Sequence, residues 1–271
     1  LKKANCNLLA IDKDLSVFKF AKKLKDKYKN RFSYITDDFK KLRNIINKKN
    51  IAMNGGIVAD LGVSSMQIDD SKRGFSFMRN GPLDMRMNSK GITAQDLIYT
   101  TNEKELAKIL WEYGNERQSR VIAKHIVKER DINIINTTFK LVDIIKKAKR
   151  NHNIKKIHPA TKTFQALRIA INEELKSLDE LLKISEEVLL PGARLVIVTF
   201  HSLEDRMVKV FFNKISGKES NINRHLPEER KYRNIKFKII NKKPIFPNSK
   251  EVSKNIRARS AKLRVIERMM V

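Results

Sequence analysis

The chain has 271 residues, and its 58 Lys and Arg against 30 Asp and Glu give a formal net charge of +28 at pH 7. A hydrophobic content of 41% supports a buried core, and no apolar run approaches the roughly 20 residues of a membrane span. One cysteine, Cys6, excludes an intrachain disulfide and a Cys-based zinc site, so we expect a cytoplasmic protein without a metal.

The basic excess favours a polyanionic partner. The chain is also rich in Asn and Ile, and AT-rich codons encode these residues together with Lys, so genome composition accounts for part of the excess. The charge is nevertheless clustered: residues 250–271 carry seven basic and two acidic residues, and residues 224–243 carry eight and two. We therefore place nucleic acid ahead of a membrane or an acidic protein as the partner.

The first third of the chain alternates between strand and helix patterns. Residues 7–11 form an apolar run that ends in an acid, residues 15–29 and 40–49 have helical spacing, and residues 32–35 and 57–61 read as further strands. Buried strands that alternate with helices predict a doubly wound α/β sheet.

From about residue 72 to 157 the strand pattern stops. Helical spacing covers residues 93–99, 103–113, 116–130 and 137–148, which predicts a helical insertion. The α/β pattern then resumes with a helix that Pro191-Gly192 ends, a strand at 194–200, a helix at 203–215 and closing antiparallel strands at 235–240 and 262–268. The expected division is a core at 1–71, an insertion at 72–157 that recognises the acceptor, and a second core part with a basic tail at 158–271.

Two residues follow predicted strands where a doubly wound fold binds its ligand. Asp12 can accept hydrogen bonds from ribose hydroxyls, but an acid at this place can equally be a helix N-cap. Phe39 can stack on an adenine, although a core phenylalanine is the more usual explanation. The residues alone leave both alternatives open.

Residues 57–88, IVADLGVSSMQIDDSKRGFSFMRNGPLDMRMN, form the most specific segment of the chain. With HPATKTFQALRIAINEEL at 158–175, FHSLEDR at 200–206 and RARSAKLRVIER at 257–268, it closely resembles the bacterial 16S ribosomal RNA (cytosine-N4) methyltransferase family, RsmH/MraW. The resemblance spans almost the whole chain. It implies a Rossmann-like S-adenosylmethionine-dependent methyltransferase core with an inserted all-helical subdomain, acting on N4 of a cytidine in the decoding region of 16S rRNA within the small (30S) ribosomal subunit.

The resemblance also implies the cofactor site. Asp12, Phe39, Asp60 and Gln67 match the family's positions for S-adenosyl-L-methionine. The family's Gly-rich loop after its first strand has no counterpart upstream of Asn7, and the chain begins with Leu. We therefore expect a longer native product, with roughly 40 further residues that supply a strand-loop-helix unit.

Methyl transfer to a cytosine amino group requires alignment and a proton acceptor, because the nitrogen lone pair is delocalised into the ring. Asp60, Ser64 and Ser65 are local candidates to accept the amino protons. His201 is the only imidazole of a second polar cluster after the strand at 194–200 and is a candidate proton acceptor. The alternative for this cluster is helix capping, which we favour for Ser202 and leave open for His201.

Further residues are candidates to bind the RNA substrate. The acceptor pocket is assigned to residues of the RGFSF and PLDMRM motifs, with a base stacked on one of the two phenylalanines, and phosphate contacts are assigned to the C-terminal cluster. An Arg–Asp pair that holds the loop, and solvated surface charge, are the respective alternatives. The candidates are Arg73, Phe75, Phe77, Asp84 and Arg86 for the pocket and Arg257, Arg259, Lys262 and Arg264 for phosphates.

Three other functions were weighed. A DNA amino-methyltransferase is disfavoured because no two of the six prolines are adjacent, and a nicotinamide dehydrogenase because no G-x-G-x-x-G occurs. A non-catalytic RNA-binding or ribosome-assembly protein stays open, since the Gly-rich loop is not found. The oligomeric state, including a homodimer, is not decided by the sequence.

Overall fold

The computed structural model describes residues 1–149, 158–218 and 235–270, which form two compact units. Unit 1 comprises Leu1–Asp12, Ser16–Gly62 and Leu175–Val271, and unit 2 comprises Lys13–Leu15 and Val63–Glu174. Unit 2 therefore begins before, and ends after, the insertion expected at 72–157. Residues 150–157 of that insertion and 219–234, which include part of the basic segment 224–243, lie outside the described residues.

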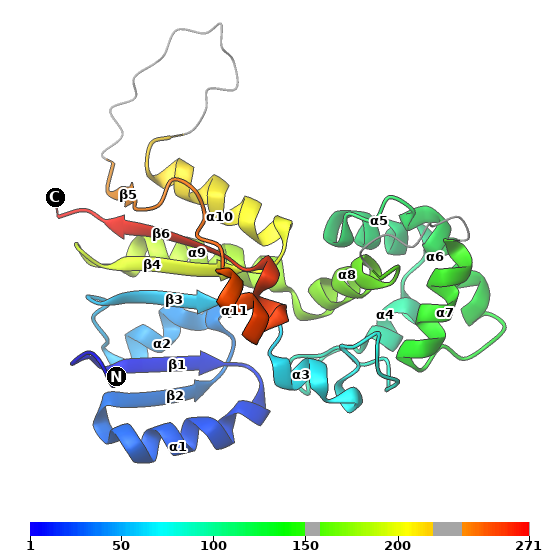
Figure 1. Ribbon diagram of the computed structural model, residues 1–271, viewed down its shortest axis with the longest axis horizontal. Helices are drawn as coiled ribbons and strands as arrows, with labels where there is room; N and C mark the ends of the chain where they lie inside the picture. The colour runs from blue at the N-terminus through cyan, green and yellow to red at the C-terminus, as the bar shows by residue number, and fades with distance from the viewer. Residues whose placement is uncertain (150–157, 219–234, 271) are drawn as a thin grey trace, which may run out of the picture. The chain divides into compact units, whose positions relative to one another are not determined.

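Unit 1 contains the sheet structure (Figure 1). β1 and β2 pair in parallel, β3 and β4 pair in parallel, and β6 lies antiparallel between β4 and β5. In the described part of the chain no ladder joins β1 to β3, so the expected sheet is divided into two-stranded and four-stranded parts. The strands are β1 Leu8–Asp12, β2 Phe32–Thr36, β3 Gly56–Asp60, β4 Arg194–Thr199, β5 Phe237–Ile239 and β6 Lys262–Arg268.

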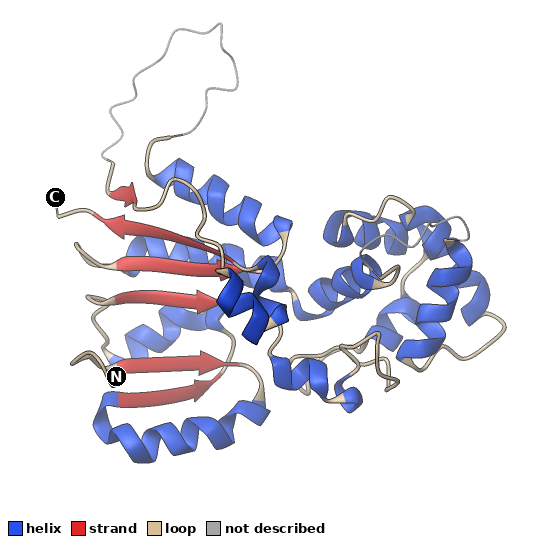
Figure 2. Cartoon of the chain, viewed as in Figure 1, coloured by secondary structure: helices blue, strands red, loops and turns tan. Residues whose placement is uncertain are grey.

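Helices pack along these strands and bury the apolar side chains between them (Figure 2). The core of unit 1 combines Ile57, Leu195 and Ile197 of the strands with apolar residues of α2, α9 and α10. Parallel strands with helical connections and an antiparallel closing pair confirm the expected Rossmann-like α/β core. The helices are α1 Phe18–Tyr28, α2 Leu42–Lys49, α9 Glu174–Val188, α10 Ser202–Ile215 and α11 Ser249–Lys254.

The regular elements of unit 2, within its described residues, are helices, and long irregular loops connect them. Its core is formed by fully buried side chains, among them Leu110, Ile122 and Leu141. Gly114 lets α5 approach α8, since a Cβ there would lie 2.5 Å from the Lys162 carbonyl oxygen. The helices are α3 Ser65–Asp69, α4 Ala94–Thr100, α5 Glu103–Gly114, α6 Ser119–Arg130, α7 Thr138–Ala148 and α8 Thr161–Asn172, which confirms the predicted helical stretches.

Short 3-10 turns complete the elements, at Leu15–Val17, Lys29–Arg31, Phe39–Lys41, Ser71–Arg73 and Ile256–Ser260. No helix in the described ranges is long and apolar enough to cross a membrane.

The start of α6 differs from the prediction, which placed it at residue 116. Glu116 is 3% exposed, and its Oε2 receives a 2.6 Å hydrogen bond from Lys149 Nζ, which also donates to the carbonyl oxygen of Pro159. The other oxygen, Oε1, accepts the N–H of Gln118. This buried ion pair fixes the turn before α6, so the helix begins only at Ser119.

Replacing Glu116 by Ala should destabilise unit 2. The change leaves the ammonium of Lys149 buried without its carboxylate, which typically costs about 3–5 kcal/mol. Denaturant unfolding followed by fluorescence of Trp111, the only tryptophan and a residue of α5, measures the loss. The matched control is Glu112→Ala, which removes a pair with Lys108 that is 3.9 Å long and exposed, worth under about 1 kcal/mol. Equal losses in the two variants would contradict a structural role for the buried pair.

Candidate active site

The C-terminal ends of the strands in unit 1 bring polar residues to one edge. Asp12 ends β1 and Asp60 ends β3, while Phe200 and His201 follow β4 directly. Because β3 and β4 are parallel and Asp60 lies opposite Val198, Asp60 and His201 are at the same end of the four-stranded sheet. This is the edge at which open α/β sheets bind their ligands.

His201 is held by Glu204 at the start of α10. The helix begins at Ser202, and its N-cap is His201, so the expectation that Ser202 is the cap was wrong. The Glu204 N–H donates to His201 Nδ1 at 3.4 Å, which places the ring proton on Nε2 in the neutral tautomer. Nε2 lies 3.1 Å from Glu204 Oε1 but makes no hydrogen bond within the described residues.

Glu204 is one of the most buried carboxylates of unit 1. It is 2% exposed, and its Oε2 accepts the N–H of Phe200 at 2.9 Å and the N–H of His201 at 3.4 Å. Both backbone donors belong to the turn between β4 and α10 and would otherwise be unsatisfied at a helix N-terminus. Glu204 therefore fixes the turn that carries His201. The sequence analysis did not single it out as more than a capping residue.

Asp60 has an unusual electrostatic environment. Asp60 is exposed on the surface, yet desolvation by the surrounding protein raises the pKa of its carboxyl above the ordinary value, and the nearby Glu204 carboxylate raises it further. A carboxyl group with a raised pKa is a better proton acceptor than an ordinary aspartate. Asp60 is thus the titratable group of this edge whose environment is tuned toward proton exchange.

In unit 1, Asp12 is the last residue of β1, and Phe39 lies shortly after the end of β2. The main-chain oxygen of Asp12 accepts the N–H of Asp37 at 3.2 Å, which joins the ends of β1 and β2, and the side chain of Asp12 is partly buried. Phe39 begins a 3-10 turn after β2 and is partly buried against the core of unit 1. Phe39 therefore contacts the core, as expected if it is a core phenylalanine, although part of its side chain stays exposed.

In unit 2, Ser64 and Gln67 stabilise the loop after β3. Ser64 is the N-cap of α3 and forms a capping box with Gln67, while Ser65 is exposed on the first turn. Gln67 is 5% exposed, and its Nε2 donates to Asp14 Oδ2 at 2.6 Å. Of the predicted residues here, Ser65 has the most accessible hydroxyl.

Asp14 is a central residue that the sequence analysis missed. It is 4% exposed and accepts hydrogen bonds from Gln67 and from Arg73, whose Nη1 lies 3.0 Å from Oδ2. Arg73 Nη2 donates to the carbonyl oxygens of Arg86 and Met87. Asp14 and Arg73 thereby tie together three separate parts of the motif loop. The only sequence signal for Asp14 was its place two residues after Asp12.

Asp84 and Arg86 form a second, bidentate pair in the loop. The Arg86 Nε and Nη2 donate to the two oxygens of Asp84 at 2.8 and 2.7 Å, and Arg86 Nη1 donates to the carbonyl oxygens of Ser89 and Gly91. Burial raises the pKa of Asp84, but the hydrogen bonds from Arg86 outweigh it and lower the pKa below its usual value. Asp84 and Arg86 therefore bind each other and the loop backbone, as expected if an Arg–Asp pair holds this loop.

The two phenylalanines of the RGFSF motif already have partners in unit 2. Phe75 is 9% exposed and belongs to the core, with the Arg73 guanidinium 5.8 Å from its ring centre. Phe77 stacks on His158 with ring centres 4.6 Å apart and planes 9° from parallel. Burial first, and then Lys146 and Lys149, lower the pKa of His158, which favours the neutral ring.

The C-terminal basic residues of unit 1 divide into two groups. Lys262 and Arg264 bind opposite oxygens of Asp205, at 3.1 and 2.7 Å. Arg257 and Arg259 lie on the 3-10 turn before β6, where Arg259 donates to the carbonyl oxygen of Ile256. Arg259 is therefore the most exposed of the four predicted phosphate ligands.

Replacing Asp60 by Asn should change how stability depends on pH. Since the folded-state pKa of Asp60 is raised, the protonated form favours the fold, and wild-type stability from this group is lost as pH rises through that pKa. Asp60→Asn should therefore gain stability relative to wild type between pH 4 and 8, measured by denaturant unfolding with far-UV circular dichroism.

The matched control for that experiment is Asp205→Asn. Burial raises the pKa of Asp205, but hydrogen bonds from Arg264 and Lys262 outweigh it and lower the pKa, so this carboxylate stabilises the fold above its unfolded-state pKa. The variant should be destabilised at neutral pH, with the difference shrinking as pH falls. The same sign for both variants would refute the assignment.

Replacing Asp14 by Asn should loosen the motif loop. The change keeps the size of the side chain but removes the charge that faces Arg73, and we expect a loss of about 1–3 kcal/mol. Trp111 fluorescence during denaturant unfolding reports it. Asp69→Asn is the control, because Asp69 pairs with Arg79 at 3.7 Å on the surface. A loss no larger than in the control would show that Asp14 does not hold the loop.

Comparison with known proteins gives one family. The sequence model of the MraW methylase family matches residues 1–269. The chain is 44% identical over 261 residues to ribosomal RNA small subunit methyltransferase H of Methylobacterium nodulans, covering 96% of this chain and 77% of the relative. It is 42% identical over 269 residues to the protein of that name in Ehrlichia ruminantium (98% and 87%) and 44% identical over 270 residues to the one in Rickettsia bellii (99% and 87%). The chain therefore belongs to the MraW methylase family, as the resemblance of its motifs indicated.

Proposed function

We propose that the protein transfers a methyl group from S-adenosyl-L-methionine to the exocyclic N4 of a cytidine in the decoding region of 16S rRNA, within the small ribosomal subunit. The observation that carries the proposal is the pair of adjacent parallel strand ends in this methylase, where Asp60 and the Glu204-bound His201 lie at one edge. The names of the relatives, which act on small-subunit ribosomal RNA, support the substrate.

The polar groups at this edge fit the cofactor. Its sulfonium would supply an activated methyl group and a positive charge, which carboxylates at the strand ends favour. Asp12 would accept the ribose hydroxyls and Phe39 would contact the adenine with its exposed part. Gln67 donates to Asp14 and accepts from Ser64, so its role would be to fix the loop.

Asp60 and His201 would handle the amino protons of the cytosine. Accepting a hydrogen bond from the amino group localises the nitrogen lone pair, and the raised pKa of Asp60 makes its carboxylate a suitable acceptor. Ser64 and Ser65 would orient the base from the adjoining loop. His201, kept in place by Glu204, would take a proton on Nδ1 only after that atom released the Glu204 N–H, so Asp60 is the first acceptor.

RNA binding would use the net charge of +28 and the exposed basic residues of the C-terminal part. Arg257 and Arg259 would contact phosphates directly, while Lys262 and Arg264 would act together with Asp205. In unit 2, Arg73, Asp84 and Arg86 would shape the acceptor loop by holding its backbone, with Phe75 and Phe77 packed beneath it.

The test is transfer of labelled methyl from S-adenosylmethionine to small subunits isolated from cells that lack the modification, with the nucleoside identified by mass spectrometry. We expect label on N4 of cytidine, and a fall in kcat of about 10²-fold or more for Asp60→Asn, in the range typical of a lost acid–base group. Asp26→Asn, an exposed change on α1, is the control and should leave the rate unchanged.

The alternative is a protein that binds RNA or assists ribosome assembly without catalysis. Binding of S-adenosylmethionine, measured by calorimetry, separates the two functions. Binding of small subunits without cofactor binding and without transfer would favour the alternative and refute the methyltransferase proposal for this protein.

A further inference from the structure

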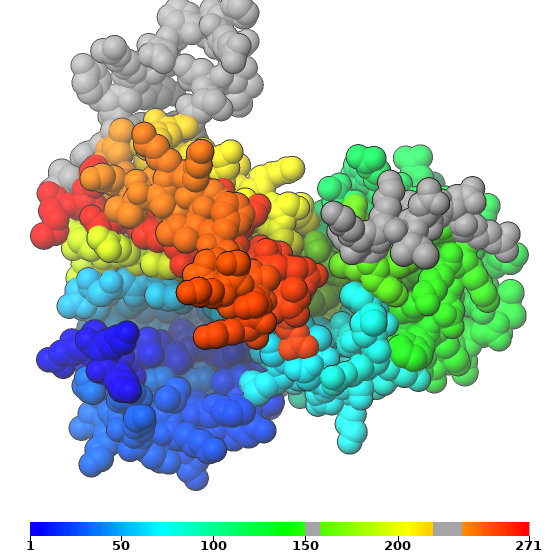
Figure 3. All heavy atoms as spheres, in the orientation of Figure 1, coloured from blue at the N-terminus to red at the C-terminus, as the bar shows by residue number. Residues whose placement is uncertain are grey.

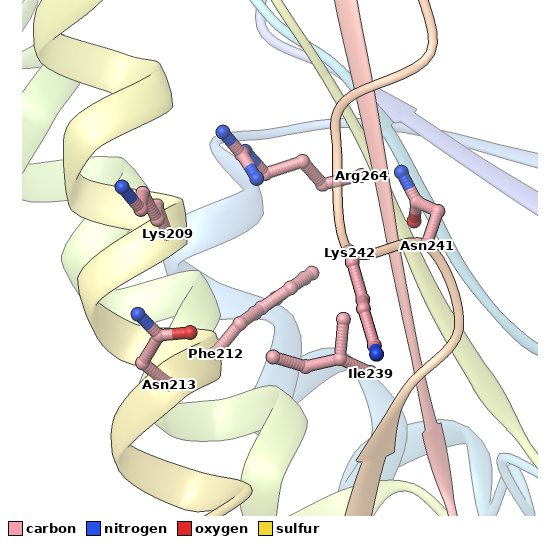
Figure 4. A pocket seen from close by; sticks show the side chains of 7 residues that line it. All are labelled: Lys209, Phe212, Asn213, Ile239, Asn241, Lys242 and Arg264. Carbon is pink, nitrogen blue, oxygen red and sulfur yellow. The ribbon is translucent and has the colours of Figure 1, made fainter. Parts of the chain in front are cut away.

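A small cavity of about 40 Å³ lies in unit 1 between α10 and the last strands. Figure 4 shows Lys209, Phe212 and Asn213 projecting from α10 on one side and Arg264 projecting toward them from β6 on the other. Ile239, Asn241 and Lys242 come from β5 and the connection that follows it. Phe212 is 2% exposed and closes the cavity toward the core.

The cavity is lined by three cationic side chains and by no carboxylate. Asp205, which is not among the lining residues, binds Arg264 at 2.7 Å and Lys262 at 3.1 Å. Within the described residues, Lys209 and Lys242 form no ion pair. Three cations around one small cavity leave a local excess of positive charge that a bound anion would offset.

One of the three cations is fixed by the fold, whereas Lys209 and Lys242 are exposed side chains. Arg264 is 8% exposed and is held by Asp205, so its guanidinium is a rigid part of the cavity wall. Asn241 accepts the N–H of Val265 and donates to the carbonyl oxygens of Lys243 and Leu263, which anchors the connection that bears Lys242. Arg264 is therefore ordered before an anion binds, and only the two lysines would lose conformational entropy on binding it.

The same connection presents an aromatic side chain to solvent. Ile245 and Leu263 exchange backbone hydrogen bonds at 2.9 Å, and the next residue, Phe246, is 59% exposed. Exposed aromatic rings beside cationic grooves stack on the bases of single-stranded RNA. In Figure 3 the segment 235–270 (orange and red) and α10 (yellow) form a continuous surface of unit 1.

We propose that this cavity binds a backbone phosphate of single-stranded RNA, with Lys209 and Lys242 as its direct ligands, Arg264 as its fixed wall and Phe246 stacking on a neighbouring base. The site rests on the proposed RNA substrate and adds an anchoring point outside the strand ends at which methyl transfer would occur. It would hold the RNA strand without contacting the reacting base.

The test uses the whole protein with the double variant Lys209→Ala/Lys242→Ala. Its Kd for unmodified small subunits and for a single-stranded RNA oligonucleotide is measured without cofactor over a range of salt concentrations. Loss of this one phosphate contact should lower the slope of log affinity against log salt by about 0.7 and raise Kd about fourfold near physiological salt. Phe246→Ala should raise Kd several-fold with little change in the slope.

Two controls make the result specific. Lys22→Ala/Lys23→Ala removes the same charge from exposed positions of α1 and should leave Kd within about twofold of wild type. Lys209→Arg/Lys242→Arg keeps the charge and should restore RNA binding, which distinguishes a lost site from a lost fold.

An unchanged Kd in the alanine pair, or a loss equal to that of the α1 pair, would overturn the proposal. RNA binding is measured without cofactor, so it does not depend on methyl transfer. If the wild-type protein transferred no methyl group, the proposed function would be refuted, and the RNA-binding test could still be interpreted.

Discussion

The parallel pairing of β3 with β4 is the constraint on which the catalytic edge depends. Ile57, Leu195 and Ile197 are buried in the core of unit 1, and their alternation along the strands fixes the register in which Asp60 lies opposite Val198. A shift of one residue would turn these apolar side chains to the other face, so the cost of exposing them maintains the register. The chemistry that we propose for Asp60 and His201 therefore rests on apolar contacts several residues away.

Buried polar contacts then shape the turns and loops that follow the strands. Irregular backbone cannot satisfy its own N–H and carbonyl groups, so side chains must supply the partners. Glu204 does this for the turn after β4, where it accepts two N–H groups beside His201. Asp14 and Arg73 do it for the motif loop of unit 2. The unusual residue composition of the motif follows from this requirement as much as from binding.

The acids of unit 1 show how neighbours decide what a carboxylate does. Asp60 is partly desolvated by the protein around it and faces the negative charge of Glu204, and the pKa of Asp60 rises. Asp205 is partly buried, yet Arg264 and Lys262 bind both of its oxygens, and its pKa falls. The environment of Asp60 favours exchange of a proton. The environment of Asp205 keeps its carboxylate ionised, so that it positions Arg264 and Lys262. Asp205 thereby holds two of the C-terminal basic side chains, Lys262 and Arg264, in fixed positions.

Local patterns in the sequence predicted the helices of unit 2, the strand ends with Asp12 and Asp60, and the antiparallel closure by β5 and β6, because each depends on periodicity within a few residues. The motifs predicted the family. Only the tertiary structure decided that Asp14 binds Arg73, 59 residues away, that His201 instead of Ser202 caps α10, and that Lys209, Lys242 and Arg264 share one cavity. Such contacts are set by how helices and strands pack, and no local periodicity records which distant side chains packing will bring together.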